Sequence, residues 1–177
     1  MLRTNTSRLV LAAALAVALA SCSGETPAEK PVETASADAA SAEGGPVDVA
    51  AVLKQREANF EAIGDAFKAI RGQLEKDAPD FALIATKATD INARAQKIAG
   101  HFPVGTSTAD GVKTEALPAI WEKPEEFKAA GQKLIDESAK LAELAKGGDK
   151  AAVGAQAMAM GGACKGCHDK FRLDDKK

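Results

Sequence analysis

The chain has 177 residues, which is enough for one domain of ordinary size. Its net charge of −2 argues against a nucleic-acid-binding protein, because phosphate contacts normally require an excess of Lys and Arg. Hydrophobic residues make up 46% of the sequence, which excludes a wholly disordered chain. With 39 alanines, a single Trp and no Tyr, the composition favours helices over strands and predicts an all-α protein.

The N-terminus has the features of a bacterial lipoprotein signal. Arg3 and Arg8 precede an uninterrupted apolar run over residues 9–20, which is short for a membrane-spanning helix. The Leu-Ala-Ser-Cys sequence that ends at Cys22 resembles a lipobox, the signal for attaching lipid to a cysteine. We expect a lipoprotein signal peptide over 1–21 and a lipidated Cys22. The alternative is an ordinary secretory signal with an incidental cysteine.

The segment that follows predicts a flexible tether. Residues 22–46 are rich in Ser, Ala, Glu, Pro and Thr and have no apolar period, so they cannot bury enough surface to fold. We therefore expect 22–46 to be a disordered membrane tether that anchors a folded domain over 47–177. That domain carries 20 acidic and 20 basic residues, and no run of charge in it indicates a partner.

From residue 47 onward, apolar residues recur at the spacing of three and four that is typical of helices. The pattern predicts four helices: 47–76, from just after Pro79 to Gly100 or His101, from Pro124 to the Gly147-Gly148 pair, and from an Asp149 N-cap through Phe171. Residues 101–118 are expected to form a long loop with a short helical turn. The predicted fold is an antiparallel four-helix bundle.

A Cys-x-x-Cys-His sequence, Cys164 to His168, lies near the end of the fourth predicted helix. Residues three and four apart share one face of a helix, so both thiols can form thioethers with one porphyrin. His168 follows directly and can place an imidazole nitrogen on the iron. We therefore expect one covalent haem c, attached through Cys164 and Cys167, with His168 as an axial iron ligand.

Three other interpretations of this motif fit the residues less well. A thioredoxin-like site would follow a strand, and no strand is predicted nearby. A zinc site would need a fourth ligand, for which His101 is the only other histidine. A plain disulfide would leave His168 without a role. Haem attachment explains all three residues, and lipidation of Cys22 would account for the third cysteine.

The position of the motif at the C-terminal end of a four-helix chain resembles the class II c-type cytochromes, the cytochrome c′ and cytochrome c-556 family. Further resemblances lie in the Phe-Pro-x-Gly-Thr sequence over 102–106, in residues 114–121 and in Phe127. The resemblance implies that Arg56, Glu115 and Arg172 lie near the haem and that the chain forms a homodimer. A pairing of Arg56 with a haem propionate would suit its guanidinium. For Arg172, a surface cation at a helix C-terminus is an equal alternative.

The same resemblance places Phe60, four residues after Arg56, on the distal side of the iron. A phenyl ring has no lone pair to donate, so the resemblance predicts a five-coordinate iron. Met158 and Met160 lie on the same helix as His168 and are expected to fill the core. His101 is the remaining candidate for a sixth ligand.

These expectations predict a periplasmic haem protein that binds nitric oxide or carbon monoxide and exchanges one electron with an unidentified redox partner. The chain is not expected to be an enzyme, although nitric oxide detoxification is left open. One alternative is a low-spin electron carrier of the c-556 type. A second is a structural helical lipoprotein without haem.

Overall fold

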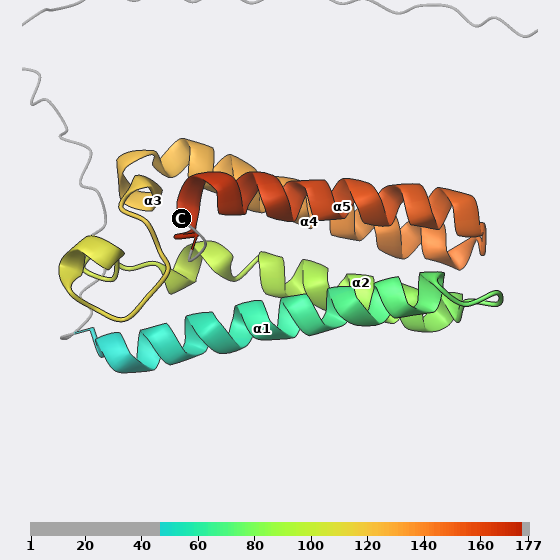
Figure 1. Ribbon diagram of the computed structural model, residues 1–177, viewed down its shortest axis with the longest axis horizontal. Coiled ribbons are helices and arrows are strands. Elements are labelled where there is room, and N and C mark those ends of the chain that lie inside the picture. The colour runs from blue at the N-terminus through green and yellow to red at the C-terminus, as the bar shows by residue number, and fades with distance from the viewer. Residues whose placement is uncertain (1–46, 175–177) are drawn as a thin grey trace, which may run out of the picture. The chain divides into compact units, whose positions relative to one another are not determined.

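The computed structural model describes residues 47–174, which form a bundle of long helices (Figure 1). The long helices are α1 (Val49–Leu74), α2 (Phe81–Ala95), α4 (Pro124–Lys146) and α5 (Lys150–Phe171). Successive long helices run in opposite directions, which confirms the predicted all-α antiparallel four-helix bundle. Within residues 47–174, no helix combines the length and apolar character needed to cross a lipid bilayer.

The connection between α2 and α4 holds three short elements. They are η1 (Ile98–His101), η2 (Thr108–Asp110) and α3 (Ala119–Glu122). The second helix was expected to continue to Gly100 or His101, but α2 ends at Ala95 and η1 covers the rest as a 3₁₀ turn. Pro103 disfavours helical backbone at Phe102, the residue before it, which accounts for the end of η1 at His101. The expected helical turn inside the loop corresponds to η2.

Three of the long helices begin with an aspartate whose carboxylate accepts a hydrogen bond from a backbone N–H of the first turn. Asp48 caps α1, Asp80 caps α2 and Asp149 caps α5. Such a cap satisfies an N–H group that has no partner inside the helix. The N-cap predicted at Asp149 is confirmed, as is the start of the next-to-last long helix at Pro124.

Helix α2 is the centre of the hydrophobic core, because it packs against both α1 and α4, and α4 packs in turn against α5. The largest fully buried apolar side chains come from all four long helices: Ile70, Ile84, Ile91, Leu141, Val153 and Met160. Burial of these side chains provides the main favourable term for holding the helices together. The packed helices therefore fix the positions of the residues at the ends of the bundle.

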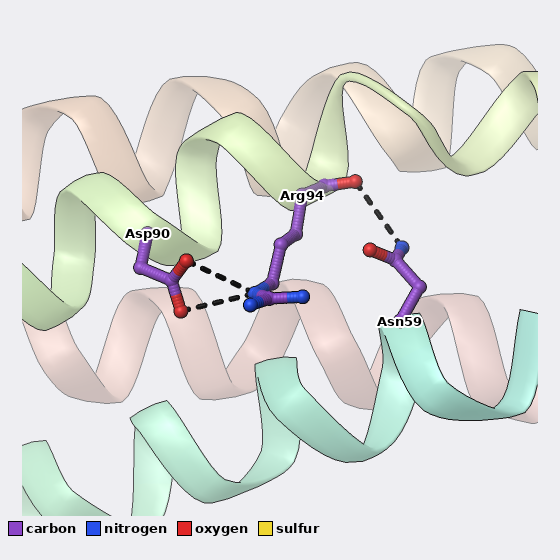
Figure 2. Close-up of polar contacts among 3 residues, drawn as sticks. All are labelled: Asn59, Asp90 and Arg94. Carbon is purple, nitrogen blue, oxygen red and sulfur yellow. Dashed lines mark hydrogen bonds and ion pairs between the residues drawn. The ribbon is translucent and has the colours of Figure 1, made fainter. Parts of the chain in front are cut away.

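A buried amide fixes α1 against α2. Asn59 is 6% exposed, and its Nδ2 donates a hydrogen bond to the backbone oxygen of Arg94 at 3.3 Å (Figure 2). The side chain of Arg94 folds back along α2, where its Nε lies 3.0 Å from both carboxylate oxygens of Asp90. A buried amide without a partner is costly, so this contact favours one register of α1 on α2. Asn59 is the residue directly before Phe60.

Candidate functional site

The Cys-x-x-Cys-His motif lies in the last two turns of α5, and this end of α5 is at the same end of the bundle as the loop over 102–118 (Figure 1). Cys164 and Cys167 are half-buried, pack against the hydrophobic core and carry free thiols. His168 is exposed, and its imidazole makes no hydrogen bond within residues 47–174. Two free thiols on one helix face and an uncommitted imidazole beside them fit a haem attached by two thioethers.

The protonation states of these three groups suit that chemistry. Burial raises the pKa of Cys164, and burial together with the neighbouring Cys164 raises the pKa of Cys167 to about 11, so both are neutral thiols at pH 7. Partial burial, followed by Arg172, lowers the pKa of His168, while Glu115 and Asp169 act in the opposite direction. A neutral imidazole is the form that binds iron. In the described part of the chain, no group of three or more His, Cys, Asp or Glu residues is placed to hold a metal ion.

The contact between α1 and α5 determines which residue of α1 lies level with His168. A Cβ atom built on Gly161 of α5 would lie 3.4 Å from Cζ of Phe67 on α1, so the two helices meet at these residues. The helices are antiparallel, and seven residues cover two turns, or about 10.5 Å. Moving seven residues back along α1 and seven forward along α5 leads to Phe60 and His168. Helical rise therefore puts the backbone positions of Phe60 and His168 at about the same level along the bundle.

Arg56 lies one turn before Phe60 and is buried, with 6% of its surface exposed. Its Nε donates to the backbone oxygen of His101 at 2.9 Å, and Nη1 donates to the backbone oxygen of Thr106 at 3.0 Å and to Oγ1 of Thr114 at 3.2 Å. Nη2 donates to Oγ1 of Thr106 at 2.5 Å. A guanidinium has five N–H donors, and these four bonds leave one. A bidentate pairing of Arg56 with a haem propionate would therefore require Arg56 to give up at least one of its hydrogen bonds to the loop.

The loop also joins the end of α5 through Glu115 and Arg172. Nε of Arg172 lies 2.5 Å from a carboxylate oxygen of Glu115, and both side chains are about half exposed. The backbone pairs beside them, because Leu117 N donates to Phe171 O and Leu173 N donates to Glu115 O. The structure thus brings Glu115 and Arg172 together. Arg172 follows His168 by four residues, and both charged groups influence the pKa of His168. Arg172 is also the C-cap of α5, so its position fits the alternative of a cation at a helix C-terminus as well.

His101, the other candidate ligand, ends η1. Its backbone oxygen is held by Arg56, and its Nδ1 is buried without a hydrogen-bond partner among the described residues. Burial, followed by the charges of Arg56 and Lys97, lowers the pKa of His101. Its ring is therefore neutral at pH 7 and retains a nitrogen lone pair.

The two methionines of α5 have different environments. Met160 is 1% exposed and fills the core, as expected. The same expectation is wrong for Met158, whose side chain is 74% exposed. Two residues along a helix correspond to a rotation of about 200°, so Met158 and Met160 face opposite sides of α5. Met158 instead borders a shallow groove between α1 and α5, near Phe67 and Gly161.

The sequence does not predict a group of aromatic contacts around Phe102, a residue that enters above only through the family resemblance. The ring of Phe102 lies between Phe60, Trp121 and Phe127 in edge-on contacts. No local signal in the sequence indicates it, because these four aromatic residues are spread over positions 60–127. The signal peptide, the tether and Cys22 lie outside the described residues.

Comparison with known proteins identifies the family. The sequence profile described as Cytochrome C' matches residues 51–172. Over 127 residues the chain is 39% identical to a cytochrome c′ of Rhodospirillum rubrum, covering 72% of this chain and 85% of the relative. Over 131 residues it is 34% identical to a cytochrome c-556 of Agrobacterium fabrum, covering 73% and 86%.

A solved structure of a cytochrome c′, described as showing an unusual ligand-controlled dimer dissociation, superposes with a TM-score of 0.67. It is 26% identical to this chain, and the match covers 73% of this chain and 100% of that structure. The profile match spans all four long helices and includes the Cys164–His168 motif. The chain therefore belongs to the cytochrome c′ family of class II c-type cytochromes, whose cofactor is a covalently attached haem c.

Proposed function

We propose that this chain is a periplasmic cytochrome c′ whose iron takes His168 as its axial ligand, has no sixth protein ligand, and binds nitric oxide or carbon monoxide. The observation that supports the proposal is the antiparallel contact of α1 and α5 at Phe67 and Gly161, from which helical rise puts backbone positions 60 and 168 at about the same level. The haem, when bound, supplies an iron that exchanges one electron and accepts a diatomic gas at its free face.

Different residues of the chain attach the haem, bind the iron and screen its other face. Cys164 and Cys167 hold the haem covalently, and the neutral imidazole of His168 binds the iron. Phe60 screens the opposite face without bonding, because its ring offers no lone pair. Met158 and Met160 supply no sixth ligand, since both are on α5, where Met158 faces solvent and Met160 is buried in the core. Because Phe60 offers no hydrogen bond to a bound gas, it favours nitric oxide and carbon monoxide over dioxygen.

The second candidate function is low-spin electron transfer of the c-556 type. It is supported by the 34% identical cytochrome c-556 and by His101, which keeps an unpartnered Nδ1. A six-coordinate iron would bind carbon monoxide poorly and act as a simple electron carrier. The structural lipoprotein without haem is set aside, because the family's cofactor is a covalent haem c. Catalytic removal of nitric oxide would be an additional activity of the same site.

The absorption spectrum of the purified holoprotein separates these functions. Under the proposal, the reduced protein is high-spin and its spectrum changes on addition of carbon monoxide. Phe60→Met would offer a thioether and shift the spectrum toward a low-spin form, whereas Phe60→Leu, which has no donor atom, would remain high-spin. A wild-type protein that is low-spin and inert to carbon monoxide would refute the proposal, and His101→Asn would then show whether His101 is the sixth ligand.

The proposed setting is the periplasmic face of a membrane. The lipobox-like sequence at Cys22 supports a lipid anchor that keeps the haem domain near membrane-bound redox partners. The relative with ligand-controlled dimer dissociation supports a homodimer. Mass spectrometry of the mature N-terminus tests the anchor: an acylated Cys22 is expected, and an unmodified N-terminus at another residue would contradict it.

A further inference from the structure

Phe102, at the start of the loop after η1, is the aromatic residue that contacts Phe60. Their ring centroids lie 6.2 Å apart with an interplanar angle of 69°. No other aromatic ring among residues 47–174 is in such contact with Phe60. Phe60 is half-buried and Phe102 packs with it against the core, so a movement of the Phe60 ring toward the loop meets Phe102 first.

Phe102 is itself held from three other directions. Its ring centroid lies 4.9 Å from that of Phe127 and 6.1 Å from that of Trp121. Nε1 of Trp121 donates a hydrogen bond to the backbone oxygen of Phe102 at 3.1 Å, which fixes the main chain as well as the ring. The guanidinium carbon of Arg56 lies 4.1 Å from the Phe102 centroid, a cation–π contact.

Arg56 links these contacts to α1. It precedes Phe60 by one helical turn, so the two side chains share a face of α1. Its four hydrogen bonds to His101, Thr106 and Thr114 keep the guanidinium in one orientation over Phe102. Thr106 is 0% exposed, and its hydroxyl also donates to the backbone oxygen of Pro103 at 2.8 Å. The loop that carries Phe102 is thereby fastened to the helix that carries Phe60.

We propose that Phe102 is a backstop that limits the movement of Phe60 and so sets the rate at which a diatomic gas reaches the iron, with Arg56 as the positioning residue that holds Phe102 in place. The inference rests on the proposed function, in which Phe60 screens the gas-binding face. Close packing makes a single ring hard to displace unless its neighbour also yields. Phe102 cannot yield easily, because its ring and its backbone are both held.

The first test is the association rate of carbon monoxide with the reduced holoprotein. Phe102→Leu removes the edge-on contact while keeping an apolar side chain, and we expect association to accelerate roughly two- to tenfold, the range that one aromatic pair contributes. Arg56→Lys keeps the positive charge but loses the planar set of donors, so it should accelerate association in the same direction. Phe81→Leu is the matched control, because Phe81 begins α2 at the other end of the bundle (Figure 1).

The second test does not depend on gas binding. In the wild-type holoprotein the ring of Phe60 should flip slowly, as measured by carbon-13 relaxation dispersion with the Phe60→Leu protein used for assignment. The flip should be faster in Phe102→Leu and unchanged in Phe81→Leu. Fluorescence of Trp121, the only tryptophan of the chain, should shift in Arg56→Lys if the loop loosens.

The two tests separate the failure of this inference from the failure of the proposed function. If the wild type binds carbon monoxide but Phe102→Leu leaves both the association rate and the Phe60 flip unchanged, the backstop is refuted and the gas-binding function stands. If the wild type is inert to carbon monoxide, the proposed function fails. The control of gas entry then fails with it, and the ring-flip measurement decides whether Phe102 restrains Phe60 at all.

Discussion

The register of α1 on α5 can be tested through Gly161, because the placement of Phe60 opposite His168 depends on it. A Cβ on Gly161 would lie 3.4 Å from Cζ and 3.7 Å from Cε1 of Phe67, whereas a Cβ on Gly154, two turns earlier on α5, would meet nothing within 4 Å. Replacing a helical glycine with isoleucine gains about 0.5 kcal/mol in helix propensity. At position 161 the larger side chain must also displace the Phe67 ring, and such overpacking costs about 1–3 kcal/mol.

Gly161→Ile should therefore lower the free energy of unfolding by about 0.5–2.5 kcal/mol, since the overpacking cost exceeds the gain in propensity. Gly154→Ile, the matched control in the same groove, should raise it by about 0.5 kcal/mol. Guanidinium unfolding of the holoprotein, followed by far-ultraviolet circular dichroism, measures both.

A double variant identifies the cause of the loss. Adding Phe67→Ala to Gly161→Ile removes the ring that clashes, so the two substitutions together should cost less than the sum of their separate effects. If Gly161→Ile is as stable as Gly154→Ile, or if Phe67→Ala gives no such relief, α1 and α5 do not meet at these residues. The alignment of Phe60 with His168 would then lose its basis.

The parts of the site that sequence could predict are those set by local spacing. Cys164, Cys167 and His168 lie within one turn of one helix, so their common face follows from helical geometry alone. The aspartate cap of α5 and the proline start of α4 depend on the first turn of each helix and were predicted for the same reason.

The contacts of the loop could not be predicted in this way, because they join residues far apart in the chain. Arg56 is separated by 45 to 58 residues from its loop partners His101 and Thr114, and Arg172 by 57 residues from Glu115. A solvated Arg56 and a loop-bound Arg56 have the same local sequence. Only the closure of the loop onto α1 decides between them, and that closure depends on how Phe102 and Trp121 pack.

Two further measurements test the chemistry of the site and the loop. The Cys164→Ala/Cys167→Ala double variant should release its haem into acidified organic solvent, whereas the wild type should retain it; a wild type that also releases haem would contradict attachment at these cysteines. The pKa of His101 is lowered by burial first and then by the charges of Arg56 and Lys97. A base with a lowered pKa in the folded state binds its proton more tightly when the chain is unfolded. The contribution of His101 to the free energy of unfolding is therefore fully present above about pH 6.5 and is lost as the pH falls below that value. The chain has two histidines, and the wild type and His101→Asn share His168, so the difference between their pH dependences from pH 7 to pH 5 isolates the contribution of His101. Thermal unfolding of the wild type should show this loss, and His101→Asn should reduce it. An equal pH dependence in both proteins would mean that protonation of His101 is not opposed in the folded state, and hence that its ring is not enclosed beside Arg56.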